Sequence, residues 1–132
     1  MSKSAIYVAN TGAQAVAVGG TINLGSIVRR FGCGVDLNGG ITIDEPGYYD
    51  VAVSITAAPT AAGDVTATML NNGVAVPGVT ATTTAAAAND PVNLSLVGIV
   101  RVYCNGNIGN LSIVLGGTAA SVTNVAVVVT KL

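Results

Sequence analysis

The chain has 132 residues, the length of one domain, and its charged residues, five Lys or Arg against six Asp or Glu, make up only 8%. A net charge of −1 excludes a basic surface for DNA or RNA, and the absence of His excludes Ser-His-Asp and Cys-His catalytic sites and His-ligated metals. With 51% apolar residues the chain is not disordered, and we expect one domain spanning residues 1–132.

The pattern predicts β-strands and no helix, because Gly and β-branched residues recur every few positions and no apolar period of 3.6 residues persists. The segments with strand character, which together predict roughly eight to ten strands, are Ile6–Val8, Gln14–Val18, Thr21–Leu24, Ser26–Phe31, Ile41–Ile43, Tyr48–Thr56, Val65–Leu70, Val74–Val76, Val92–Cys104, Ile108–Leu115 and Val122–Lys131. Thr80–Ala88 is either a thin strand or an exposed loop. Strands at this spacing without helices are typical of an antiparallel sandwich or barrel.

Turn residues separate several of these strands. Gly19-Gly20 lies between two of them, and Asp44–Gly47 combines Pro with Gly as turns require. Asn71-Asn72-Gly73 is the strongest local hairpin signal in the chain. A further turn is expected at Asn105–Asn107.

Two strands are apolar on both faces, which predicts that a second subunit covers one of them. In Val92–Cys104, the side chains of Val97, Ile99 and Tyr103 oppose an already apolar face. In Val122–Lys131, one face carries Val125, Val127 and Val129, and the other carries Val122, Ala126 and Val128. The predicted subunit interface, which also takes a tyrosine and an arginine, comprises Tyr48, Val97, Ile99, Arg101, Tyr103, Val125 and Val127.

The stretch ITIDEPGYYDVAVSI, from Ile41 to Ile55, resembles the strand-turn-strand of the tumour necrosis factor and complement globular-head superfamily. Ser95–Ile108 is similar to that family's next landmark, although Gly106-Asn107 lacks the family's acidic turn residue, and Ser121–Leu132 fits its closing strand. The resemblance covers most of the chain from about Ile41 onward. It implies an all-β antiparallel jelly-roll sandwich that assembles as a homotrimer.

The stretch AVAVGGTINLGSI, from Ala15 to Ile27, resembles the N-terminal half of small jelly-roll proteins of tailed bacteriophages and prophages. That resemblance implies a non-enzymatic virion protein on the capsid surface, a decoration protein or head fibre. Its partner would be the major capsid protein or another virion protein, with Met1–Val18 as a docking segment or first strand. The alternative is the receptor- or glycan-binding head of a tail fibre or surface adhesin.

The N-terminus does not predict a signal peptide, because Asn10, Thr11 and Gly12 interrupt its apolar stretch. No apolar run of ~18 residues predicts a membrane helix. We therefore expect synthesis in the bacterial host cytoplasm and no membrane partner. Cys33 and Cys104 are expected either as two small buried residues or, if their strands adjoin, as a disulfide.

The sequence gives little support for catalysis or metal binding. Asp44 and Asp50 could be imagined as a glycosidase pair, but we expect a turn residue and a surface or interface charge. No Asp-x-Asp spacing of the kind that binds calcium occurs. Taken together, these observations predict no catalytic, cofactor or metal site.

The arginines are expected in ordinary ion pairs. Arg29 and Arg30 should point to opposite faces, one of them toward an acid from the set Asp44, Glu45 and Asp50. Arg101 would pair with an acid of a neighbouring subunit or remain an ordinary surface charge.

Overall fold

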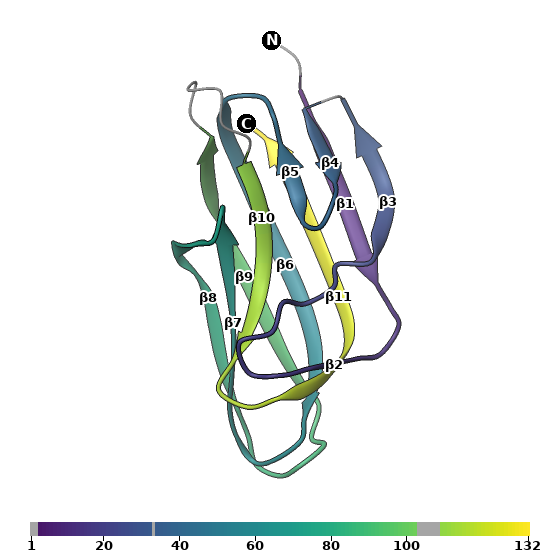
Figure 1. Cartoon of the computed structure of the whole chain (residues 1–132), viewed down its shortest axis with the longest axis vertical. Helices are drawn as coiled ribbons and strands as arrows, with labels where there is room; N and C mark the ends of the chain where they lie inside the picture. The colour runs from purple at the N-terminus through teal and green to yellow at the C-terminus, as the bar shows by residue number, and fades with distance from the viewer. Residues whose placement is uncertain (1–2, 33, 103–108) are drawn as a thin grey trace.

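Two antiparallel sheets pack face to face in the computed structural model, which describes residues 3–32, 34–102 and 109–132 (Figure 1). Sheet A has the order β3-β1-β11-β6-β9, with β2 pairing on β11, and sheet B has the order β4-β5-β10-β7-β8. The strands of sheet A are β1 (Ala5–Asn10), β2 (Gln14–Val16), β3 (Ser26–Phe31), β6 (Gly47–Pro59), β9 (Val92–Val102) and β11 (Ala120–Lys131). The strands of sheet B are β4 (Val35–Leu37), β5 (Ile41–Ile43), β7 (Gly63–Asn71), β8 (Val74–Ala85) and β10 (Gly109–Gly116).

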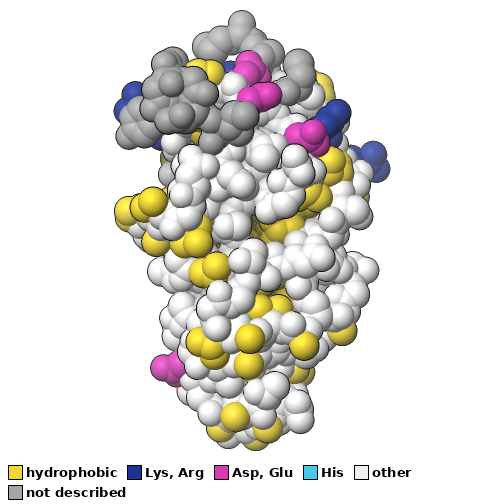
Figure 2. All heavy atoms as spheres, in the orientation of Figure 1, with side chains coloured by type: hydrophobic (Ala, Val, Ile, Leu, Met, Phe, Trp, Pro, Cys, Tyr) yellow, Lys and Arg dark blue, Asp and Glu magenta, His cyan; other side chains and the backbone are white. Residues whose placement is uncertain are grey.

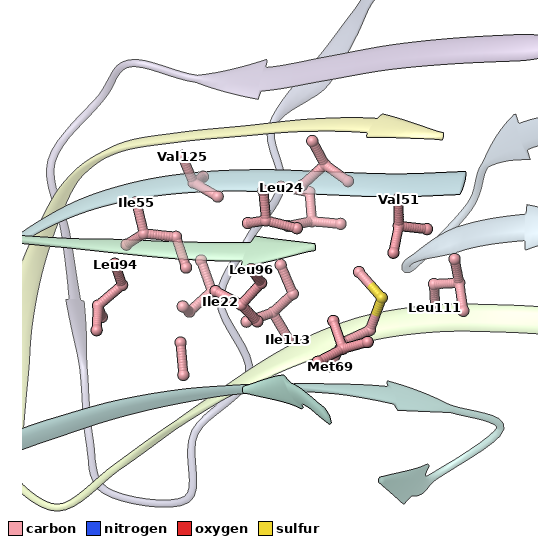
Figure 3. Packing of buried hydrophobic residues seen from close by; sticks show 14 of the residues in the cluster. Ile22, Leu24, Val51, Ile55, Met69, Leu94, Leu96, Leu111, Ile113 and Val125 are labelled. Atoms are coloured by element: carbon pink, nitrogen blue, oxygen red, sulfur yellow. The ribbon is translucent and has the colours of Figure 1, made fainter. Parts of the chain in front are cut away.

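The core lies between the two sheets and is built by strict alternation along the strands. In β6 the inward residues Tyr49, Val51 and Ile55 are fully buried, while their neighbours point outward. Figure 3 shows side chains of both sheets meeting in this layer, with Val125 and Leu96 from sheet A and Met69 and Ile113 from sheet B. Alternation along Tyr48–Thr56 predicts Tyr49, Val51, Val53 and Ile55 as the core face, and their burial confirms it.

A bulge in β11 changes the expected phase of the last strand. Its pairing with β6 shifts register between Val122 and Asn124. Val122 is therefore buried together with Val125, although uninterrupted alternation places the two on opposite faces. The expectation that Val122 lies on the same face as Val128 is wrong for this reason.

The hairpin predicted at Asn71-Asn72-Gly73 is confirmed. Asn72 and Gly73 both have positive φ, 55° and 82°, as a type I′ turn requires, and Asn71 pairs with Val74. The second strand continues to Ala85, so the Thr-rich segment is a strand for most of its length. Threonine hydroxyls pair across the hairpin, Thr66 with Thr82 and Thr68 with Thr80, each at 3.0 Å.

The two segments on either side of the Gly19-Gly20 turn do not pair with each other. β2 pairs with β11 of sheet A, and the chain then crosses to β10 of sheet B, where the Ile22 amide donates to the Ile113 carbonyl at 2.8 Å. The crossing buries Ile22 and Leu24 in the core between the sheets. Strand β4 was not expected, because three residues between glycines give too weak a signal.

The structure describes eleven strands and no helix among its resolved ranges, slightly more than the roughly eight to ten expected. Within those ranges no segment is a helix of the length and apolarity needed to cross a bilayer. Some expectations lie outside the described residues. They concern the turn at Asn105–Asn107, Tyr103 and the two cysteines, Cys33 and Cys104.

Gly98 of β9 allows the edges of the two sheets to approach each other. A Cβ atom added there would collide with Cγ2 of Val79 in β8, which is 1% exposed. We expect Gly98→Ala to lower the free energy of unfolding by roughly 1–3 kcal/mol, because a buried β-branched side chain has little room to shift. Denaturant unfolding measures this change. In the background of Val79→Ala the same substitution should cost much less, and equal costs in both backgrounds would contradict the contact.

Candidate subunit interface

The outer faces of the two sheets differ in chemistry. On sheet A, Tyr7 pairs with Val128, Val128 with Ala52, and Ala52 with Val97, which forms one row across four strands. Cross-strand partners point to the same face, so the row is continuous. On sheet B, the corresponding outward positions are mostly hydroxyl or amide side chains: Thr42, Thr66, Thr68, Thr80, Thr82, Asn110 and Ser112.

A second group of side chains extends the row toward one end of β9. Ile99 is 59% exposed and pairs with Asp50. Tyr48 pairs with Arg101, whose guanidinium carbon lies 5.4 Å from the centre of the Tyr48 ring, within reach of a cation–π contact. We define the apolar face as the outward side chains Tyr7, Tyr48, Ala52, Val97, Ile99 and Val128.

Four of the residues predicted for a subunit interface lie on or beside this face. Tyr48, Val97, Ile99 and Arg101 all point outward from β6 and β9. Whether another subunit covers them remains a prediction. Tyr103 belongs to the residues that the structure does not describe.

Val125 and Val127 do not belong to this set, so that part of the interface prediction is wrong. Both have 0% exposure and pair with Ile55 and Val53 inside the sandwich. Their side chains are buried in the chain's own core and cannot contact a second copy. Tyr7 and Val128, 37% and 40% exposed, occupy the outer face instead. Only the register of β1 on β11 brings these two together, and no local motif marks that pairing.

An ion-pair cluster holds both ends of the chain against the turn before β6. Lys131 Nζ lies 3.6 Å from Glu45 Oε1, and the Ser4 hydroxyl is 3.5 Å from Glu45 Oε2. The Lys131 amide donates to the Ser4 carbonyl at 2.8 Å, and Tyr49 donates its hydroxyl to the Glu45 carbonyl at 2.8 Å. Glu45 thus contacts a lysine rather than the arginine that the sequence suggested.

Other charged side chains lie at the same end of the molecule. Arg30 pairs with Asp36 at 3.0 Å, an acid that was not among its expected partners. Asp44 lies in a small hollow with Arg30 and Asp36, and Asp50 does not line that hollow. Figure 2 shows most of the charged side chains at the upper end and only an isolated acidic group lower down. Across the resolved ranges, no cluster of acids or cysteines has the composition of a metal site.

No protein-family model and no curated protein matches this chain. Solved structures match it over nearly its whole length. The TNF protein Eiger from S. frugiperda is 10% identical with a TM-score of 0.65, covering 98% of this chain and 91% of its own. The globular domain of the zebrafish complement 1qA protein is 8% identical with a TM-score of 0.64, covering 97% and 95%. The phage PRD1 vertex protein P5 is 15% identical with a TM-score of 0.59, covering 98% and 96%.

These similarities establish the fold. The chain is an all-β jelly roll of the kind found in TNF and complement globular heads, and the expected fold class is confirmed. At identities of 8–15% the likeness extends to the fold alone.

Tyr49 gives this end of the molecule a measurable pH dependence. Burial first, and then the charges of Glu45 and Asp44, raise the pKa of Tyr49 from 10.0 to about 12. The folded chain holds this proton more tightly than the unfolded chain, so the resulting stability is present below pH 10 and is lost between about 10 and 12.

We expect Tyr49→Phe to flatten the loss of stability in that pH window, by at most about 1.4 kcal/mol per pH unit. Urea unfolding of both proteins from pH 9 upward gives the difference between their free energies of unfolding. Taking this difference removes the contributions of other titrating groups, which the two proteins share. The same slope in both proteins would show that Tyr49 ionises equally well in the folded state.

Proposed function

We propose that the chain is a non-enzymatic virion structural protein that assembles as a homotrimer and decorates or stabilises a bacteriophage capsid, as a decoration protein or head fibre. The observation that carries the proposal is the apolar face of sheet A. Its exposed valine, isoleucine and tyrosine side chains are aligned in register, while sheet B presents hydroxyls and amides to solvent.

The apolar face is costly to leave in water. Val97 and Ile99 are 70% and 59% exposed at neighbouring outward positions of β9. Covering them would contribute roughly 1–2 kcal/mol each. Asp50 lies within the face, between Tyr48 and Ala52 on β6 and opposite Ile99, and Arg101 lies at one end of it, opposite Tyr48. Charges of a second copy could complement both. A second copy of the chain is therefore the occupant we favour for this surface.

A place on the virion is supported by the likeness to the phage PRD1 vertex protein P5, which covers both chains almost completely. The low charge of the chain also suits a protein that spends its time largely covered by neighbours. Of the first eighteen residues, Ala5–Asn10 form a strand inside sheet A, between β3 and β11. Docking on a capsid protein would therefore use the surface around this strand rather than a detached arm.

A receptor- or glycan-binding head is the second candidate. A hollow of about 250 Å³ opens beside sheet B, and its lining includes Asn23, Ser112 and the glycines Gly39 and Gly40. Amide, hydroxyl and backbone groups of this kind can hydrogen-bond a sugar. No aromatic side chain lines the hollow, and so the sugar would lack a stacking partner.

The assembly is tested by the mass in solution. We expect light scattering on a sizing column to give about three times 12.9 kDa. Val97→Asp should shift the mass to 12.9 kDa, because it places a charge on the apolar face beside Ile99, where covering it would leave it without a partner. Val18→Asp is the matched control, since Val18 is 59% exposed in the loop after β2 and lies off the apolar face. A monomeric parent protein, or an unchanged mass for Val97→Asp, would refute assembly through this surface.

Binding assays distinguish a decoration protein or head fibre from a recognition head, because the two bind different targets. A decoration protein or head fibre should bind capsids that lack it, at a fixed copy ratio and saturably, when mixed and sedimented together. A recognition head should instead bind host cells or glycans on its own. Binding to cells or glycans without any binding to capsids would overturn the proposed function in favour of the second candidate.

A further inference from the structure

Strand β3 is the end member of sheet A and has an open edge. Its only neighbour among the described strands is β1, and all six of its residues are exposed. Ile27, Val28 and Phe31 are 38%, 52% and 65% exposed. An edge with free backbone groups and apolar side chains is a template for a further strand.

Positive charge gathers at this edge. Arg29 and Arg30 belong to β3, and the backbone of Lys3 lies against Gly32, the residue that follows the strand. Arg30 is paired with Asp36, whereas Arg29 and Lys3 form no ion pair with the residues that the structure describes. In Figure 2, basic side chains are visible at the upper right, where Figure 1 places β3 and β4.

A largely apolar hollow adjoins the edge on the outer face of the sheet. It has a volume of about 290 Å³, and it is lined by Ala5, Ile6, Tyr7, Phe31 and Val128 together with Arg29 and Arg30. Arg29 pairs in register with Tyr7, so its guanidinium and the hollow belong to the same face. A ligand strand beside β3 would meet a cation and an apolar depression together.

We infer that the β3 edge binds an extended acidic segment of a partner protein by strand addition. Backbone hydrogen bonds to the edge would hold the segment, a carboxylate would pair with Arg29, and an apolar side chain would enter the hollow. The inference rests on the proposed function in taking that partner to be a virion protein. The binding itself does not require the chain to self-associate.

A second copy of β3 is a poorer occupant of the same edge. Pairing two β3 edges would bring four arginines together, and like charges facing each other across strands are destabilising. Residue Val28 is also extra in the pairing with β1, because Tyr7 pairs with Arg29 and Val8 with Ile27. Such a bulge bends the edge locally and affects any added strand, so charge repulsion is what disfavours a second copy.

The test uses the full chain and a peptide of alternating valine and glutamate, with a valine–lysine peptide of equal length as the control. We expect the acidic peptide to slow hydrogen exchange at residues 26–31 at least tenfold and the basic peptide to have no effect. Arg29→Glu should lower the affinity for the acidic peptide at least tenfold, as measured by titration calorimetry. Arg101→Glu, the same charge change at the opposite edge of sheet A, should leave the affinity within twofold.

Several results would overturn the inference: equal binding of both peptides, an unchanged affinity for Arg29→Glu, or protection away from residues 26–31. Protection of these amides by raising the protein concentration alone would identify a second copy as the occupant instead. Val97→Asp keeps the two proposals distinguishable. A failure of that variant to change the solution mass speaks against self-association, whereas the peptide test is read from the amides of residues 26–31 and from Arg29.

Discussion

The pairing of β11 with β6 at the centre of sheet A is the constraint on which the rest of the structure depends. This ladder runs from Lys131 opposite Tyr49 to Ala120 opposite Pro59. Every inward residue that it places in the core leaves an outward neighbour on the opposite face, because side chains alternate along a strand. The same register that buries Val127 against Val53 therefore exposes Val128 beside Ala52. Core and surface are two results of one hydrogen-bonded ladder.

Part of the outward set in sheet A is apolar, the face around Val97, Ile99 and Val128, whereas most outward positions of sheet B have hydroxyl or amide side chains. The threonine pairs of β7 and β8 hydrogen-bond to each other. The charged neighbours of the apolar face are Asp50 and Arg101. In a chain with only 8% charged residues, this asymmetry identifies the surface with most to gain from being covered.

Charges are concentrated where strand ends and chain ends meet. Glu45 with Lys131 joins the last strand to the turn before β6, and Arg30 with Asp36 joins the edge of sheet A to β4 of sheet B. Arg29 is the cation of β3 that is left without an ion pair among the described residues, and it stands at the open edge. The apolar face and the β3 edge differ in chemistry, one suited to a second copy and one to an acidic strand, and they meet at Tyr7 and Val128, which also line the hollow beside the edge.

The sequence by itself determined the all-β class, the inward face of the strand after Gly47 and the Asn72-Gly73 hairpin. These features depend on local alternation and on turn residues with positive φ, which neighbouring residues decide. Only the tertiary structure decided that Val125 and Val127 belong to the core, that Tyr7 joins Val128 on the outer face, and that the segment before Leu24 crosses between sheets. Where both faces of a strand carry apolar residues, as in Ala120–Lys131, periodicity does not show which face meets the second sheet. That choice depends on pairing between distant strands and on a bulge at Val122, which no local pattern encodes.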